Sequence, residues 1–193
     1  MTARPESFDD VEGLRSGSPE VWGALCEAYS EQLWRYVARQ LGSDRDAVAD
    51  AVQETLLAAA RSATKFDPER GTVWAWLSGI AHHQVALHWR KLAARRIDSA
   101  EPHFDDSPGG AALPDERLIQ EDSVELVRRI LAELASDHAS FLLAKYNDGL
   151  SVEDMVDRFG GTVEGVRSRL ARARREFKRK YQTATVKEVE RLK

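Results

Sequence analysis

The pattern of apolar and polar residues is helical along most of the chain. Apolar side chains recur at intervals of three and four residues, which places them on one face of an α-helix. The first long run starts after Ser18 and Pro19, an N-cap residue followed by the proline that suits a first helical position, and it ends at Gly42. Similar runs follow Asp44 and Thr72. Alternation with a period of two does not extend over a useful length of the sequence, so the pattern predicts an all-α fold.

The periodic pattern is interrupted at residues 98–122. Pro102, Pro108 and Pro114 lie there with two glycines and many acidic residues, while large apolar groups are few. This composition cannot bury enough apolar surface to offset the entropy of ordering it, so the segment is predicted to be a flexible acidic linker between two small helical domains. The predicted organisation is an N-terminal extension (1–17), a first domain (18–97), the linker (98–122), a second domain (123–182) and a tail (183–193).

A helix-turn-helix pattern lies in the second domain. A short amphipathic run from Ser151 to Phe159 is followed by Gly160 and Gly161, and Thr162 then caps a longer, basic run. The apolar positions of this longer run share one face. The opposite face fits the major groove of duplex DNA, where arginine reads guanine edges and phosphates. The candidate DNA-binding residues on that face are Thr162, Glu164, Gly165, Arg167, Ser168, Arg169 and Arg172.

Charge is distributed unevenly, although the formal net charge is only −4. Residues 162–181 hold eight basic and two acidic residues, and residues 88–96 hold four basic and no acidic ones. Residues 98–122 hold eight acidic residues against Arg117. Two basic clusters separated by an acidic segment indicate two contacts with a polyanion such as nucleic acid. The alternative interpretation is that these are the solvated charged faces that many helical proteins carry.

Aromatic residues are concentrated in residues 65–91, which contain Trp74, Trp76 and Trp89 beside several basic residues. Aromatic rings next to basic groups are typical of sites that stack unpaired bases of single-stranded nucleic acid. Aromatic residues at helical spacing are more often part of a core. We expect Trp76, four residues before Ile80, to be buried, and Trp74, on another face beside the loop, to be the candidate for DNA contact.

Composition and spacing disfavour other classes of protein. Cys26 is the single cysteine, so neither an internal disulfide nor a thiolate metal site can form. The acidic N-terminus does not resemble a secretory signal, and the apolar stretches are too short to cross a bilayer, which predicts a cytoplasmic protein without membrane insertion. His82, His83 and His88 lack the i, i+4 spacing of a helical metal site. We therefore expect no metal, no cofactor, no small-molecule substrate and no catalytic activity.

Motifs of both domains occur in a fixed order. The first domain contains Asp50-Ala51-Val52-Gln53-Glu54-Thr55-Leu56, then Phe66-Asp67-Pro68, then Ala75-Trp76-Leu77-Ser78-Gly79-Ile80-Ala81. The second contains Gly149-Leu150-Ser151-Val152-Glu153-Asp154-Met155-Val156 and Gly165-Val166-Arg167-Ser168-Arg169-Leu170-Ala171-Arg172-Ala173-Arg174. Together these motifs resemble the extracytoplasmic-function (group IV) sigma factors of bacterial RNA polymerase, in the sigma-70 family. The resemblance covers residues 18–96 and 124–178, on the two sides of the linker.

The resemblance implies that the first domain is sigma region 2 and that the second is sigma region 4. It implies that core polymerase binds a helix surface formed by Asp46, Asp50, Gln53, Glu54 and Leu57. It implies that the loop around residues 65–71 captures a flipped base of the −10 element and that the next helix contacts the melted strand and its duplex. The residues assigned to the −10 element are Lys65, Phe66, Arg70, Trp74, His82, His83, Arg90, Lys91 and Arg95. The helix that follows Thr162 would read the −35 element.

The partners implied by the resemblance are core RNA polymerase, through its β′ clamp coiled coil and its β flap, promoter DNA, and an anti-sigma factor. The predicted function is that of a sigma factor, which directs core polymerase to a subset of promoters and assists opening of the −10 region. Two alternatives remain open from the sequence. One is a helix-turn-helix regulator without a sigma role, and the other is a metal-dependent enzyme that uses the histidines. Binding to core polymerase separates the first of them from a sigma factor.

Overall fold

The fold consists of helices joined by short turns. The computed structural model describes residues 10–98 and 114–191. No strand occurs within these two ranges, and the prediction of an all-α fold is confirmed. In chain order the elements are α1 (Val11–Ser16), α2 (Pro19–Leu41), α3 (Arg45–Ser62), the 3-10 helix η1 (Ala63–Lys65), α4 (Val73–Asp98), α5 (Pro114–Ala132), α6 (Ser136–Leu142), the π-helix η2 (Leu143–Asn147), α7 (Val152–Phe159) and α8 (Val163–Arg191).

Several helices begin at the capping residues that the sequence predicts. The Ser18 hydroxyl accepts a hydrogen bond from the Val21 N–H at 3.4 Å at the start of α2. Asp44 caps α3 in the same way, at 2.9 Å. Ser151 and Asp154 form a reciprocal capping box at the start of α7. Each cap satisfies an N–H group that the first helical turn leaves without a partner, which is why these boundaries follow from local sequence.

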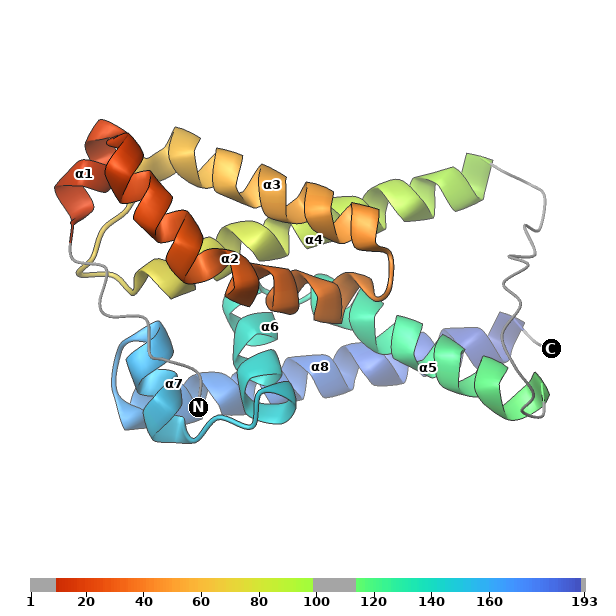
Figure 1. Ribbon diagram of the computed structural model, residues 1–193. Helices are drawn as coiled ribbons and strands as arrows, with labels where there is room; N and C mark the ends of the chain where they lie inside the picture. Colours follow the sequence, from red (N-terminus) through yellow and green to blue (C-terminus); the bar gives the residue numbers. More distant parts are fainter. Residues whose placement is uncertain (1–9, 99–113, 192–193) are drawn as a thin grey trace.

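The first half of the molecule, residues 10–98, is built around α2, α3 and α4, which form the upper layer in Figure 1. Leu25, Leu33, Leu77 and Val85 from α2 and α4 are fully buried between them. The short α1 adds the fully buried Leu14 to one end of this core. Residues 1–17 were predicted to be an extension, but α1 lies within them and packs as part of the first half.

The second half, residues 114–191, forms the lower layer in Figure 1, with the long α8 against α5 and α6. The Phe141 ring of α6 stacks on the Phe159 ring of α7 with 4.8 Å between their centroids. The turn between α7 and α8 needs Gly160 and Gly161, whose φ angles of 77° and 95° are in the region that side chains rarely adopt. This turn sets the angle at which α8 leaves α7.

Two segments differ from the expected organisation. The helix α5 begins at Pro114, so residues 114–122 are helical although they fall within the predicted linker. Their sequence opens with proline and two acidic residues, which suit the first turn of a helix. The helix α8 continues to Arg191, so the predicted tail at 183–193 extends this helix as far as the structure describes it. The rest of the predicted linker, residues 99–113, lies outside the described residues.

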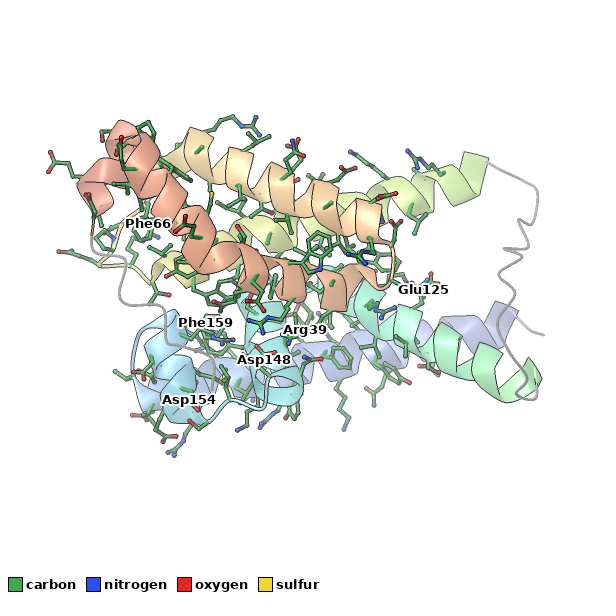
Figure 2. All side chains as sticks on the ribbon, in the orientation of Figure 1. Arg39, Phe66, Glu125, Asp148, Asp154 and Phe159 are labelled. Atoms are coloured by element: carbon green, nitrogen blue, oxygen red, sulfur yellow. The ribbon has the colours of Figure 1, made fainter. Side chains whose placement is uncertain are left out.

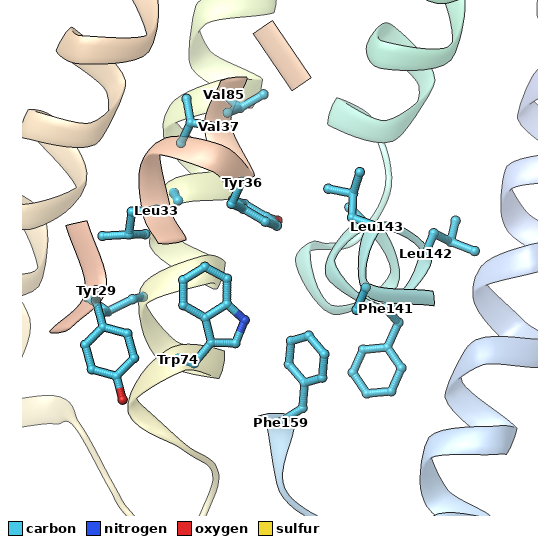
Figure 3. Close-up of a cluster of buried hydrophobic side chains, with 14 of the residues drawn as sticks. Tyr29, Leu33, Tyr36, Val37, Trp74, Val85, Phe141, Leu142, Leu143 and Phe159 are labelled. Atoms are coloured by element: carbon cyan, nitrogen blue, oxygen red, sulfur yellow. The ribbon is translucent and has the colours of Figure 1, made fainter. Parts of the chain in front are cut away.

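The two halves pack directly on each other, a question that the sequence leaves open. Arg39 of α2 and Asp148, which follows η2, meet at their boundary (Figure 2). Deeper in the molecule, Tyr36 and Trp74 of the first half face Phe141 and Phe159 of the second (Figure 3). The buried apolar residues of both halves form one continuous cluster. The hydrophobic core therefore joins the two halves instead of ending within each.

Candidate functional site

The helix α8 presents the face that the sequence assigns to DNA. Thr162 caps it by accepting a hydrogen bond from the Gly165 N–H at 3.1 Å. Val166 and Leu170 are 1% and 3% exposed and pack α8 against the other helices of the second half. The opposite face is open to solvent: Gly165 is partly covered, and the exposed residues are Thr162, Glu164, Arg167, Ser168, Arg169 and Arg172. The predicted set is therefore brought together on one accessible surface.

Arg169 is held in place on that surface by an aromatic ring. Its guanidinium carbon lies 5.8 Å from the centroid of the Phe141 ring of α6. A cation over a ring face is attracted by the ring's quadrupole, and the contact limits the freedom of an otherwise long side chain. On the same surface, Arg172 donates a hydrogen bond to the Ser168 hydroxyl at 3.1 Å. Part of the ordering entropy of these side chains is thus lost before any ligand binds.

The residues predicted to bind core polymerase form a stripe along α3. They are spaced at intervals of three and four, so they share one face of the helix. All are exposed, and the side chain of Leu57 is 43% exposed. Glu54 pairs with Arg61 at 3.5 Å. We call this stripe the α3 surface; its residues are Asp46, Asp50, Gln53, Glu54 and Leu57.

The residues predicted to bind the −10 element differ in how far their side chains are buried. The exposed ones lie in the loop before α4 and along α4: Lys65, Arg70, His83, Arg90, Lys91 and Arg95. Three others are buried: Phe66, Trp74 and His82 are only 4%, 5% and 4% exposed. The exposed members are therefore spread from the segment before α4 to its C-terminal half, while the aromatic residues and one histidine of the predicted set are buried.

Trp74, the candidate for DNA contact, is buried, and Trp76, which we expected to be buried, is partly buried against the core. Trp74 stacks on Tyr29, with 6.4 Å between their centroids, and meets the edge of the Tyr36 ring at 5.8 Å. Trp76 is only partly buried and packs on Phe66 at 5.0 Å. The physical reason is that apolar residues lie on several sides of α4, so periodicity alone does not identify the side that faces α2.

His82 is bound between the two halves. One ring nitrogen lies 3.4 Å from the side-chain oxygen of Gln40, and the other lies 3.0 Å from the backbone oxygen of Leu134. Burial lowers the pKa of His82 below its ordinary value, and the nearby His83 acts in the same direction. The Leu134 carbonyl and the charge of Asp137 oppose this shift, but burial is the largest cause. His82 therefore has a packing role in this arrangement.

The stability of the protein is expected to fall as the pH drops below about 6.5, in part through His82. Its pKa is lower in the folded chain than in the unfolded chain, so the unfolded chain binds the proton first and acidification favours unfolding. Urea unfolding of the wild type and of His82→Gln, at about pH 7.5 and about pH 5.5, measures this contribution. The wild type should lose more stability on acidification than the variant. An equal loss in both would show that His82 contributes nothing to the pH dependence.

Arg15 of α1 contacts the loop before α4, and the sequence did not predict this contact. Its guanidinium donates a hydrogen bond to the backbone carbonyl of Phe66 at 2.6 Å, in the loop predicted to capture a −10 base. Within the same loop, Asp67 accepts from the Glu69 N–H at 3.0 Å. The loop is thus held from outside by α1 as well as from within. The sequence carries no motif at Arg15, since the pairing joins residues far apart in the chain.

Metal and membrane sites are not found in the described part of the molecule. No group of three or more His, Cys, Asp or Glu side chains is arranged there to hold a metal ion. Among the same residues, no helix combines the length and apolar character that a membrane span requires. The glycine pair at residues 160–161 serves the turn between α7 and α8.

The chain is similar to known transcription factors over nearly its whole length. The family model described as Sigma-70 region 2 matches residues 25–96. The ECF RNA polymerase sigma factor SigC of Mycobacterium tuberculosis is 33% identical over 181 residues, which cover 90% of this chain and 92% of the relative. The ECF RNA polymerase sigma-E factor of Escherichia coli (strain K12) is 26% identical, with coverage of 89% and 92%. Among solved structures, CnrH in complex with the cytosolic domain of CnrY shares 23% identity and covers 89% of this chain and 94% of its own, with a TM-score of 0.48.

These relatives span both halves of the molecule, so the likeness is not confined to a helix-turn-helix that many regulators share. The alternative of a regulator without a sigma role is accordingly not supported. The exposed face of α8 and the α3 surface lie within the aligned length. From this likeness over both halves, the chain belongs to the extracytoplasmic-function group of RNA polymerase sigma factors, in the sigma-70 family.

Proposed function

We propose that this sigma factor binds its partners through three separate surfaces. The α3 surface binds core RNA polymerase, the exposed basic residues of α4 and of its preceding loop contact the −10 element, and the exposed face of α8 reads the −35 element. The proposed domains are centred on the predicted residues 18–97 and 123–182; α1 packs on the first, and the second also includes the start of α5 at Pro114 and α8 as far as Arg191. The single observation that carries the proposal is the α3 surface, where acidic, amide and apolar side chains are presented together on one accessible helix face.

The α3 surface is suited to a protein partner. Leu57 offers apolar area at one end of a stripe of acidic and amide side chains, and protein interfaces combine buried apolar area with a polar rim. The stripe is acidic, so it would repel DNA phosphates. We assign it to the coiled-coil clamp of the β′ subunit, and we assign a second polymerase contact, to the β flap, to the second half.

The basic surfaces are suited to nucleic acid. The exposed face of α8 carries arginines at Arg167, Arg169 and Arg172, which fit phosphates and guanine edges in the major groove. Arg90 and Lys91 are exposed in the C-terminal half of α4, about 25 Å along the helix from the preceding loop, where we place the path of a melted strand and its duplex. Removing a base from its stack costs a few kcal/mol, which a prepared site and phosphate contacts can offset.

The proposal extends to the setting in which the protein acts. It works in the cytoplasm, where core polymerase and promoter DNA are found, and it has no catalytic activity, cofactor or small-molecule substrate of its own. An anti-sigma factor controls it by covering the surfaces that bind polymerase. Support for this control comes from the resemblance to the family.

Gln53→Ala combined with Glu54→Ala is expected to weaken binding to core polymerase by at least about tenfold. Both side chains are exposed on α3, so their loss should leave the fold intact. Binding is measured by fluorescence anisotropy of labelled protein titrated with core polymerase, and circular dichroism checks the helix content.

The matched control is Glu31→Ala combined with Gln32→Ala, which removes the same two side-chain types from α2. The control should bind core polymerase as the wild type does. If the α3 variant retains wild-type affinity, the α3 surface is not the docking site and the assignment fails. If both double variants weaken binding equally, the effect is one of charge and not of position.

A further inference from the structure

The short helix α1 is fixed on the start of α2 by several contacts. Asp10 caps its first turn by accepting a hydrogen bond from the Gly13 N–H at 2.7 Å, and Gly17 ends it with a φ of 78°. Leu14 is fully buried, and its backbone carbonyl accepts a hydrogen bond from the Trp22 indole of α2 at 3.2 Å. Capping, burial and this side-chain bond therefore give α1 a defined position.

The packing of α1 on α2 leaves no room for a side chain at Gly13. A Cβ atom at this position would lie 2.5 Å from the Cγ2 methyl of Val21 and 2.7 Å from a carboxylate oxygen of Asp10. Such distances are shorter than real Cβ contacts, and the methyl of the β-branched Val21 has little freedom to move away. The position of α1 therefore depends on glycine at residue 13.

From this position α1 reaches the loop of residues 66–72, which joins η1 to α4 (Figure 2). The Arg15 guanidinium donates a hydrogen bond to the backbone carbonyl of Phe66 at 2.6 Å. The Phe66 N–H donates to the carbonyl of Ala63 in η1 at 3.0 Å, and the Phe66 ring packs on Trp76 of α4 with 5.0 Å between centroids. The N–H, the carbonyl and the ring of Phe66 are thus each held by a different element.

Phe66 is the residue at which the chain leaves η1 and enters the loop. Lys65 directly before it and Arg70 four residues after it are exposed, and both are assigned to the −10 element. The direction of the loop depends on the peptide plane between Phe66 and Asp67, because the carbonyl of one residue and the N–H of the next share a plane. Arg15 holds this plane through its carbonyl oxygen.

The other bonds of the loop do not replace the bond from Arg15. Asp67 accepts hydrogen bonds from the Glu69 N–H at 3.0 Å and, at its carbonyl, from the Arg70 N–H at 3.1 Å. Both join residues of the loop to each other, so they define its turn and not its direction. Thr72 fixes the far end of the loop by capping α4 at 3.1 Å. The bond from Arg15 ties the near end to a separate helix, and a charged donor makes such a bond stronger.

We propose that Arg15 is a positioning residue for the −10 element, because α1 holds the 66–72 loop, through the Phe66 carbonyl, in the conformation that captures the flipped base. The inference rests on the proposed function, since that function assigns the loop to the −10 element. Arg15 acts through the loop and does not itself contact DNA. Without it the loop adopts other directions, and the apparent affinity for the melted strand falls with the fraction of molecules whose loop is in place.

Arg15→Met tests this role, because it keeps a long side chain and removes the hydrogen-bond donor and the charge. The probe is a single strand spanning the −10 region of promoters that the wild-type holoenzyme selects from a random library. Fluorescence anisotropy measures its affinity for polymerase reconstituted with each form. Arg15→Met should bind the strand about tenfold more weakly, as expected when about a tenth of the loops are in place, and its affinity for core polymerase should not change.

The matched control is Arg35→Met, which removes an exposed arginine whose ion-pair partner, Glu31, lies on the same helix α2. Arg35→Met should bind both the strand and core polymerase as the wild type does. An equal loss of strand affinity in the two variants would show an effect of net charge and would overturn the assignment of Arg15.

Salt dependence separates positioning from direct contact with a phosphate. A phosphate contact releases a counterion, so its loss would reduce the slope of log affinity against log salt by about 0.7 for a single strand. Arg15→Met should weaken binding at every salt concentration and leave the slope unchanged. A reduced slope would make Arg15 a direct DNA contact and would overturn the inference.

Gly13→Ala displaces α1 without any change of charge, since the new Cβ meets Val21 and Asp10. It should weaken binding of the strand in the same direction as Arg15→Met, again with an unchanged slope. Circular dichroism checks that both variants keep the helix content of the wild type. Wild-type affinity for the strand in both variants would overturn the inference.

Lys65→Ala combined with Arg70→Ala tests the proposed function separately, because it removes the exposed basic side chains assigned to the −10 element at this loop. If this double variant weakens binding of the strand and Arg15→Met does not, the loop binds DNA but α1 does not position it, and the inference alone fails. If the double variant binds as the wild type does, the assignment of the loop to the −10 element fails, and the inference fails with it.

Discussion

Phe141→Ala is expected to lower the free energy of unfolding by about 3–5 kcal/mol, a large part of the stability of a small protein. Phe141 is 2% exposed, and it stacks on Phe159 at the point where α6 meets α7. Truncation removes its buried apolar area and leaves a cavity that the surrounding helices fill only in part. Arg169 also loses the ring on which its guanidinium lies.

Chemical denaturation followed by circular dichroism measures this loss. Tyr146→Ala is the matched control, because it truncates another aromatic residue five positions along the same segment, where the residue is 64% exposed. The control should change stability by no more than about 0.5 kcal/mol, as surface substitutions usually do. Equal effects of the two substitutions would contradict the packing of α6 against α7.

Arg169→Ala is expected to reduce transcription that depends on the −35 element by about five- to 150-fold, the range that corresponds to about 1–3 kcal/mol for a bidentate contact with a base. Arg169 lies in the middle of the exposed face of α8, and the Phe141 ring orders its side chain. A pre-ordered arginine loses little entropy when it binds, so its removal should be costly. Binding to core polymerase should not change.

The assay uses polymerase reconstituted with the wild type or a variant, on promoters selected from a random library by the wild-type holoenzyme. Arg175→Ala is the control, since it removes the same charge from an exposed position farther along α8. It should weaken promoter binding less and without dependence on the −35 sequence, as a phosphate contact would. If Arg169→Ala supports full transcription, α8 does not read the element through this residue.

Local sequence was enough to predict most of the helix starts and the exposed face of α8, while the residues of the α3 surface came from the family resemblance. The caps at Ser18, Asp44 and Ser151 fix where helices begin, because each satisfies free N–H groups within its own turn. The exposed face of α8 follows from periodicity, since its apolar positions fall on one side and leave the polar ones outside. The capping rules also predict a helix start at Pro114, where proline is followed by two acidic residues. The proline-rich composition around it instead led to the prediction of a linker.

Only the tertiary structure decided which side of α4 is buried and how the halves meet. Spacing favoured Trp76 for the core and Trp74 for DNA contact, whereas in the structure Trp74 is buried against Tyr29 and Tyr36 of α2. Arg15 and Phe66 are 51 residues apart in sequence, and Tyr36 and Ser140 are 104 apart. Helical periodicity describes a helix by itself and carries no information about its neighbour. The packing of the two halves on each other therefore depends on long-range contacts, which exist only after the helices have come together.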